Sequence, residues 1–282
     1  MSQPFSIPGI EEIWREDARL FRANRSRLYR FGYQGYNRGV SLKWVRQGEE
    51  RYRVNGIWHR VKAGQFLVVN HDSEIEVDIK ARDLVEGICL YVSPFELAAA
   101  LGELGGSEHP SELPEQVFPA QGYPLSRWLA RLDQLGPACL APDELRLALI
   151  EQVAAHALRT RGEQLRIQAK RADTQAERYR RLLLGMQHAQ AHLHQPLRVL
   201  DLAHEAGLSE FHFFRAFRQA FGLTPVQWLT RCRMQQARRL LQSGAHGAHE
   251  VAYLVGYGDP SHFGKVFRRT FGLPPGQWRK RD

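Results

Sequence analysis

The chain of 282 residues has little cysteine and no long apolar run, and its first residues do not predict a secretory leader. Its three cysteines (Cys89, Cys139 and Cys232) lack the spacing of a metal site or a redox motif, so we expect buried, reduced thiols. No apolar run approaches the ~18 residues that a membrane span needs, and the first residues lack the basic and apolar regions of a signal peptide. These absences predict a cytoplasmic protein that does not enter a membrane.

The charge, by contrast, is plentiful and uneven. Residues 175–282 hold sixteen Lys and Arg against seven Asp and Glu, which accounts for the whole net charge of +9, and the remaining residues are balanced. A block this basic favours a polyanionic partner, and nucleic acid is the commonest one. A basic surface that is merely solvated is the alternative.

The basic block also repeats itself. Residues 207–228 are "GLSEFHFFRAFRQAFGLTPVQW", and residues 256–278 are "GYGDPSHFGKVFRRTFGLPPGQW". Each copy predicts a short helix, a glycine turn and a second helix, which Ser209 caps in the first copy and Asp259 with Pro260 in the second. This is the pattern of a DNA-binding helix-turn-helix.

The second helix of each copy has a face that we expect to point outward. In the first copy this face carries Phe211, Phe214, Arg215 and Arg218; in the second it carries Ser261, Gly264, Lys265 and Arg268. Arginine can bind guanine or phosphate and phenylalanine can contact thymine methyl groups, so these faces suit a major groove. Burial of Phe211 and Phe214 against a neighbouring helix is the alternative. For His212 and His262 we expect packing or a phosphate contact.

One helix connects the two copies. Thr224 and Pro225 begin it, and its roughly 18 residues span ~27 Å at 1.5 Å per residue. Successive major grooves on one face of DNA lie ~34 Å apart. The two copies can therefore read two consecutive grooves.

Residues 177–282 resemble the double helix-turn-helix domain of AraC/XylS-type bacterial transcription regulators, most specifically in "VAYLVGYGDPSHFGKVFRRTFGLPPGQW". The resemblance implies seven helices, with double-stranded promoter DNA and RNA polymerase as partners. It places base contacts on Phe211, Phe214, Arg215, Pro260, Ser261, His262 and Lys265, and phosphate contacts on Arg218, Arg268 and the helix N-termini. Gly247 and Ala248 depart from the family pattern and predict a looser second copy.

The N-terminal half predicts a β-sandwich or barrel. Glycines at 8- or 9-residue spacing separate short strand-like runs such as "VSLKWVRQ" and "QFLVVN", and Asn55-Gly56 signals a tight hairpin. Residues 102–124 look like a connection, and helices are expected after Ser93, over about 124–135 and over about 142–166. The apolar stripe of the last helix (Leu145, Leu149, Val153 and Ala157) can pack on the barrel or on another subunit.

In AraC-type regulators the N-terminal half is often a cupin-like barrel that binds an effector and dimerises, and the resemblance implies both here. The candidate effector-binding residues are Trp44, Arg53, His59, Asn70 and His71. Because the sequence does not fix which face of its strand each residue takes, a purely structural role is the alternative for each of them. The predicted fold class is α+β with two domains. Residues 1–165 form the cupin-like barrel with flanking helices, 166–176 a linker, and 177–282 an all-α domain with two helix-turn-helix units.

An enzyme is not expected. Cupin enzymes hold a metal with a clustered His-x-His, a Glu and a further His, whereas the strand region offers His59 and His71, twelve residues apart. His192 and His194 lie on a predicted helix, where positions i and i+2 face apart. We expect no metal and no cofactor. The favoured function is a transcription activator switched by a small molecule; the alternative is control by a protein partner or by dimerisation alone.

Overall fold

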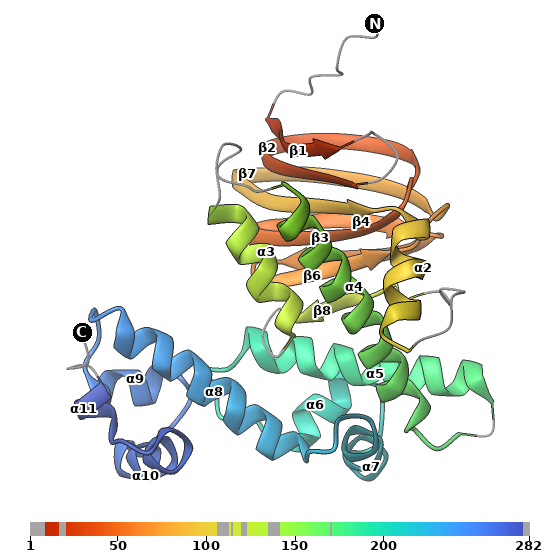
Figure 1. Ribbon diagram of the computed structural model, residues 1–282. Coiled ribbons are helices and arrows are strands. Elements are labelled where there is room, and N and C mark those ends of the chain that lie inside the picture. Colours follow the sequence, from red (N-terminus) through yellow and green to blue (C-terminus); the bar gives the residue numbers. More distant parts are fainter. Residues whose placement is uncertain are drawn as a thin grey trace, which may run out of the picture. The chain divides into compact units, whose positions relative to one another are not determined.

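The computed structural model describes residues 9–16, 21–105, 113, 115–119, 123–134, 142–169 and 171–278. The chain divides into two compact units, a barrel unit of residues 1–162 and a helical unit of residues 163–282. Helix α4 (Pro142–Leu165) runs across this division. The barrel and the helices confirm the predicted α+β fold class with two domains (Figure 1).

In the described residues of the barrel unit, eight antiparallel strands form one sheet that curls into a nearly closed barrel (Figure 1). They are β1 (Ile10–Glu16), β2 (Phe21–Tyr36), β3 (Val40–Gln47), β4 (Glu49–Val54), β5 (Ile57–Lys62), β6 (Gln65–Val69), β7 (Glu74–Val92) and β8 (Val117–Pro119). Strand β7 lets the sheet curl because its first half pairs with β4 and its last half with β3. Its other edge pairs with β2.

The predicted hairpin turn is confirmed. Asn55 and Gly56 have φ angles of 47° and 82°, and two central residues with positive φ define the turn that fits twisted strands. Other parts of the barrel differ from the sequence expectation. Strands β1 and β2 were not predicted, β8 lies inside the stretch taken for a connection, and two runs predicted as separate strands join into β7.

Side chains of the strands alternate between the inside of the barrel and an outer face. Apolar side chains fill part of the inside: Leu28, Val45, Tyr52, Val54, Val61, Leu67, Val69, Ile75, Val77, Ile79, Val85 and Val117. Helices α2 (Pro94–Glu103), α3 (Pro124–Gln134) and α4 lie over one side of the sheet (Figure 1). The apolar stripe predicted for α4 is buried, from Leu145 to Ala157, which supports packing on the barrel.

An aromatic cluster joins the sheet to α4. Phe66 of β6 and Phe118 of β8 stack with ring centroids 5.4 Å apart, and the ring of His156 from α4 lies 4.7 Å from Phe118. Both ring nitrogens of His156 are buried without a hydrogen-bond partner. Burial, with a smaller effect from the Arg159 charge, lowers the pKa of His156 to about 3, so this side chain is neutral.

Residues 171–278, a described part of the helical unit after α4, contain the seven helices that the resemblance implied. They are α5 (Ala172–Ala191), α6 (Val199–Glu205), α7 (Glu210–Phe221), α8 (Pro225–Gln242), α9 (Ala248–Leu254), α10 (Pro260–Phe271) and α11 (Pro275–Trp278). Helix α8 runs from the pair α6 and α7 to the pair α9 and α10 (Figure 1). Phe213 and Phe217 form the core of the first pair, and Phe263 and Phe267 that of the second.

Two glycines permit close approaches inside the helical unit. A Cβ added at Gly185 of α5 would lie 2.8 Å from the Leu202 carbonyl oxygen and 2.8 Å from the Phe213 ring. Gly256 has a φ of 82°, and an added Cβ would lie 2.3 Å from the Leu193 carbonyl oxygen. A side chain at Gly185 would separate α5 from α6 and α7, and one at Gly256 would push the turn after α9 away from the turn at Leu193.

Candidate functional site

The turn of each helix-turn-helix is built from a glycine and a capping side chain. Gly207 has a φ of 61° after α6, and the Ser209 hydroxyl caps α7. Gly256 has a φ of 82° after α9, and the Asp259 carboxylate caps α10, with Pro260 at the first helical position. The sequence prediction for both turns is confirmed. These turns set the angle between α6 and α7 and the angle between α9 and α10.

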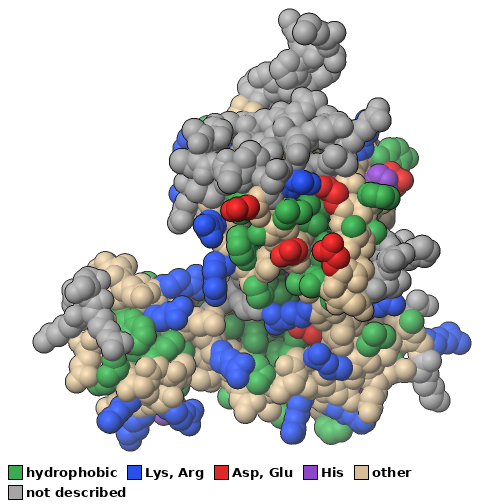
Figure 2. Space-filling view, in the orientation of Figure 1, with side chains coloured by type: hydrophobic (Ala, Val, Ile, Leu, Met, Phe, Trp, Pro, Cys, Tyr) green, Lys and Arg blue, Asp and Glu red, His purple; other side chains and the backbone are tan. Residues whose placement is uncertain are grey.

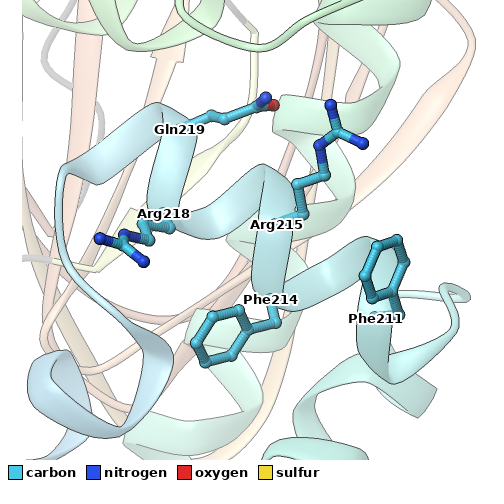
Figure 3. A pocket seen from close by; sticks show the side chains of 5 residues that line it. All are labelled: Phe211, Phe214, Arg215, Arg218 and Gln219. Atoms are coloured by element: carbon cyan, nitrogen blue, oxygen red, sulfur yellow. The ribbon is translucent and has the colours of Figure 1, made fainter.

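Helix α7 has one buried side and one exposed side. Phe213, Ala216, Phe217 and Ala220 are buried, whereas Phe211 is 69% exposed and Phe214 37% exposed. The interpretation that these two phenylalanines are packed away is therefore wrong. Beside them stand the exposed Arg215 and Arg218, and with Gln219 they line a hollow of about 320 Å³ (Figure 3).

Helix α10 presents a more polar surface. Ser261, His262, Lys265 and Arg268 are exposed, and Pro260 is half-buried. The His262 ring packs beside Tyr257, with centroids 5.6 Å apart. In α7, the equivalent His212 has its Nδ1 2.8 Å from the Ser209 hydroxyl. Both histidines thus have local packing or hydrogen-bonding roles, and neither adjoins a group of metal ligands among the described residues.

Basic side chains are spread over the exposed surface of the helical unit (Figure 2). Arg215, Arg218, Lys265 and Arg268 all lie on the two outward helix faces. Helix N-termini add positive potential, because their first backbone N–H groups have no partner within the helix. The surface formed by α7 and α10 is therefore suited to bind a polyanion.

A second group of polar side chains lies inside the barrel. Lys43 of β3 is 5% exposed, and its ammonium donates hydrogen bonds to Tyr91 Oη at 2.9 Å and to Cys89 Sγ at 2.7 Å. No carboxylate of the described residues lies within ion-pair distance of this ammonium. Asn24 of β2 pairs with Cys89 in the strand register, and its Oδ1 is buried without a hydrogen-bond donor.

Glu50 of β4 completes this barrel cluster. It is 3% exposed and accepts a hydrogen bond from the Tyr52 hydroxyl. Burial raises the pKa of Glu50, and Tyr52 and Lys43 oppose that rise. The cluster (Asn24, Lys43, Glu50, Cys89 and Tyr91) therefore combines a buried cation, a desolvated carboxyl group and an amide oxygen without a donor. Such groups in a barrel interior are suited to hold a small polar molecule.

Comparison with known proteins settles the family. A model described as a helix-turn-helix domain matches residues 202–281, and one described as an AraC-like ligand binding domain matches residues 20–136. The chain belongs to the AraC family of transcription regulators. These regulators are not enzymes, in agreement with the sequence prediction.

Individual relatives align with parts of this AraC-family chain. The transcriptional activator RhaS of Salmonella arizonae is 40% identical over 58 residues, 21% of either protein, so the alignment spans about a fifth of this curated relative. The DNA-binding domain of AdpA, solved with a target DNA, is 36% identical and covers 35% of this chain and 89% of that one, with a TM-score of 0.34. The C-terminal domain of AraT from Geobacillus stearothermophilus is 29% identical and covers 36% and 85%, with a TM-score of 0.35.

The predicted effector residues of the AraC-family barrel do not come together. Trp44 pairs with Phe66 and Ile88 on the outer face, and Arg53 is exposed on β4, 3.5 Å from Glu76. The Asn70 side chain binds the backbone of Leu113, and His71 Nδ1 accepts a hydrogen bond from Gly39 N at 2.9 Å. Of the five, His59 lies on the inner face, opposite Tyr52.

The barrel cluster was missed by the sequence reasoning, although a signal existed. Lys43 stands in the middle of the apolar run "VSLKWV", where a charged residue must either reach solvent or be buried with partners. The expected burial is confirmed for Cys232 but not for Cys89. Cys232 is buried, which raises the pKa of its thiol to about 12, and Cys89 is half-buried; Cys139 lies outside the described residues.

His192 and His194 follow the end of α5 at Ala191, so the prediction that both lie on a helix is wrong. His192 Nδ1 hydrogen-bonds the His188 carbonyl oxygen at 2.9 Å. In the described part of the chain no helix is long and apolar enough to cross a membrane.

Proposed function

We propose that this AraC-family chain binds double-stranded promoter DNA in a sequence-specific manner and regulates transcription. The observation that carries the proposal is the outward face of α7. There, two exposed phenylalanines stand beside two exposed arginines, while the opposite side of the same helix is fully buried. Large exposed aromatic side chains mark an interaction surface, and arginine beside them suits the edges and phosphates of DNA.

Helices α7 and α10 contribute differently to DNA recognition. Phe211, Phe214 and Arg215 contact bases, and Arg218 and Arg268 bind phosphates. In α10 the base contacts fall on Pro260, Ser261, His262 and Lys265. The second copy contributes less, because its outward face carries Ser261, Gly264 and Lys265 where the first carries Phe211, Phe214 and Arg215.

Binding to DNA can be tested with a duplex that the full chain selects from a random pool, compared with a scrambled duplex. Arg215→Ala should cost ~1–3 kcal/mol on the selected duplex and little on the scrambled one. Arg268→Ala should weaken binding to both and lower the salt slope by about one. Lys265→Ala should cost less on the selected duplex than Arg215→Ala.

Arg82→Ala serves as the matched control, because Arg82 is exposed on the barrel unit. Affinity for the selected duplex should fall steeply over a fourfold rise in salt, since bound phosphates release counterions. An affinity that barely changes with salt contradicts the electrostatic basis of the proposal. Equal losses on both duplexes for Arg215→Ala show that Arg215 does not read a base.

We also propose that a small molecule bound in the barrel switches the regulator. The support is the barrel cluster, where the Lys43 ammonium is buried without an ion-pair partner among the described residues and Asn24 Oδ1 lacks a donor. The interaction of Lys43 with Glu50 compensates this charge only in part, and a buried cation without a close counter-charge is costly. A ligand with a carboxylate and a hydroxyl group would supply the counter-charge and the missing donor.

A thermal-shift screen of small carboxylates against neutral analogues tests this site. A ligand at 100 times its Kd adds ~2.7 kcal/mol to stability, and Lys43→Met should abolish that gain. Lys80→Met is the control, because Lys80 is exposed on the same barrel beside Asp78. If no carboxylate stabilises the chain, the alternative of control by a protein partner or by dimerisation gains support. The apolar side chains that fill part of the barrel favour that alternative.

The remaining assignments rest on the family. RhaS is an activator, and we infer that this chain also activates, in contact with RNA polymerase and in the cytoplasm at the bacterial nucleoid. We infer a homodimer formed through the N-terminal half. Sedimentation of residues 1–170 at tens of micromolar should show dimer, and a monomer at that concentration contradicts the inference.

A further inference from the structure

The segment that follows α4 is built into the helical unit. Ile167 is 0% exposed, and its carbonyl oxygen accepts a 2.8 Å hydrogen bond from Gln175 Nε2. Just before it, the buried Glu163 accepts a 2.6 Å hydrogen bond from the Tyr179 hydroxyl, and Tyr179 is 0% exposed. A buried apolar side chain and a buried hydrogen bond anchor this segment on α5. Residues 163–168 are therefore anchored to the helical unit by the buried Glu163 and Ile167 and do not behave as a loose tether.

The same segment also contacts the second half of α7. Arg166 Nη1 donates to the Ala220 carbonyl oxygen at 2.9 Å, and the Gln168 backbone N–H donates to Gln219 Oε1 at 3.3 Å. The Gln168 side chain then accepts, at its Oε1, a 2.9 Å hydrogen bond from Arg215 Nη2. Gln168 is thus held at its backbone and touches, with its side chain, the arginine at the centre of the outward face.

We propose that Gln168 is a positioning residue for Arg215, and hence that DNA specificity depends on a residue outside both helix-turn-helix units. The proposal rests on the DNA-binding function proposed above. A free arginine side chain carries ~2 kcal/mol of rotamer entropy that binding must overcome. One hydrogen bond to a fixed glutamine restricts the guanidinium before DNA arrives and leaves the other N–H donors for a guanine edge.

The contacts around Arg215 support a role of Gln168 in orienting this side chain for DNA, and they do not support a role in holding it away from DNA. Arg215 remains exposed although it is bonded to Gln168. Its side chain and that of Gln219 extend toward each other, at the rim of the hollow that Phe211 and Phe214 also line (Figure 3). The glutamine amide is neutral, so it does not compete with phosphate for the arginine as a carboxylate would. The opposite role, in which Gln168 withholds Arg215 from DNA, predicts tighter binding when Gln168 is shortened.

The test compares variants of the full chain on the selected and the scrambled duplex. Gln168→Ala should weaken binding to the selected duplex about three- to tenfold and leave the scrambled duplex unchanged, because it frees the Arg215 side chain. Gln168→Asn keeps the amide but is too short to reach, so it should behave in the same way. In an Arg215→Ala background, neither change should have a further effect.

Gln164→Ala is the matched control, because Gln164 is a nearby half-buried glutamine whose side chain makes no hydrogen bond to the described residues. Thermal melting of each variant verifies that it folds. If the wild-type chain selects no sequence from the pool, the proposed DNA-binding function fails first. If it selects a sequence that Gln168→Ala and Gln168→Asn bind as tightly as Gln164→Ala does, or more tightly, the positioning role of Gln168 is overturned while DNA binding stands.

Discussion

The buried His156 should make the stability of the barrel unit depend on pH. In the unfolded chain a histidine takes up a proton near its ordinary pKa of 6.5, whereas in the folded chain His156 does so near 3. Between these values the unfolded state binds the additional proton, so stability is complete above pH 6.5 and falls as the pH is lowered. Each pH unit below 6.5 costs up to about 1.4 kcal/mol, which amounts to about 2 kcal/mol at pH 5.

His156→Phe isolates this effect, because phenylalanine suits the aromatic cluster of Phe66 and Phe118 and cannot be protonated. The free energy of unfolding is measured by urea denaturation at pH 7.5 and at pH 5. The wild-type chain should lose about 2 kcal/mol more than His156→Phe between the two pH values. Comparing the two losses removes any packing penalty of the larger ring and the titration of the other histidines. Equal losses would refute a desolvated, neutral His156.

Two further predictions concern the helical unit. Gly185→Ala should destabilise the chain, since its Cβ would lie 2.8 Å from backbone and ring atoms; Gly264→Ala, with nothing within 4 Å, should stabilise it by ~0.5–1 kcal/mol through helix propensity. Thermal melting of both variants measures this, and a Gly185→Ala variant as stable as the wild type contradicts the packing described. A fragment of residues 163–282 should melt well above one of residues 177–282, which lacks the buried Ile167. Equal melting temperatures would show that this anchor adds no stability.

The helical unit was predictable because its signals are local. Gly207 and Ser209, and later Gly256 and Asp259, mark their turns and caps within a few residues of chain. The buried and exposed sides of α7 follow from helical spacing alone. Local signals do not extend to the segment 163–168, whose contacts with α7 bridge about fifty positions. Nothing in its mostly polar sequence indicates that it is anchored to the helical unit.

The barrel was only partly predictable because strand faces depend on register. Trp44 and Lys43 are neighbours, yet one faces the helices and the other the barrel interior. A one-residue difference in parity exchanges the two faces of a strand, so the sequence alone does not tell which of Trp44, Arg53 and His59 face the interior. Strand β2 was not predicted because its sequence, "FRANRSRLYRFGYQGY", is rich in arginine and glycine. It forms a strand because it pairs with β7, which lies far along the chain.

Helix α8 constrains how this regulator can evolve new target sites. Its 18 residues join the two helix-turn-helix pairs, and its apolar side is buried from Trp228 to Leu241. Inserting one residue would rotate one pair against the other by about 100° and shift it by about 1.5 Å. Three base pairs turn the duplex by a similar angle, at 10–10.5 pairs per helical turn, but they advance it by about 10 Å, so no change of spacing in a promoter matches both the rotation and the shift. New target sequences therefore arise through substitutions on the outward faces of α7 and α10, while the length of α8 stays fixed.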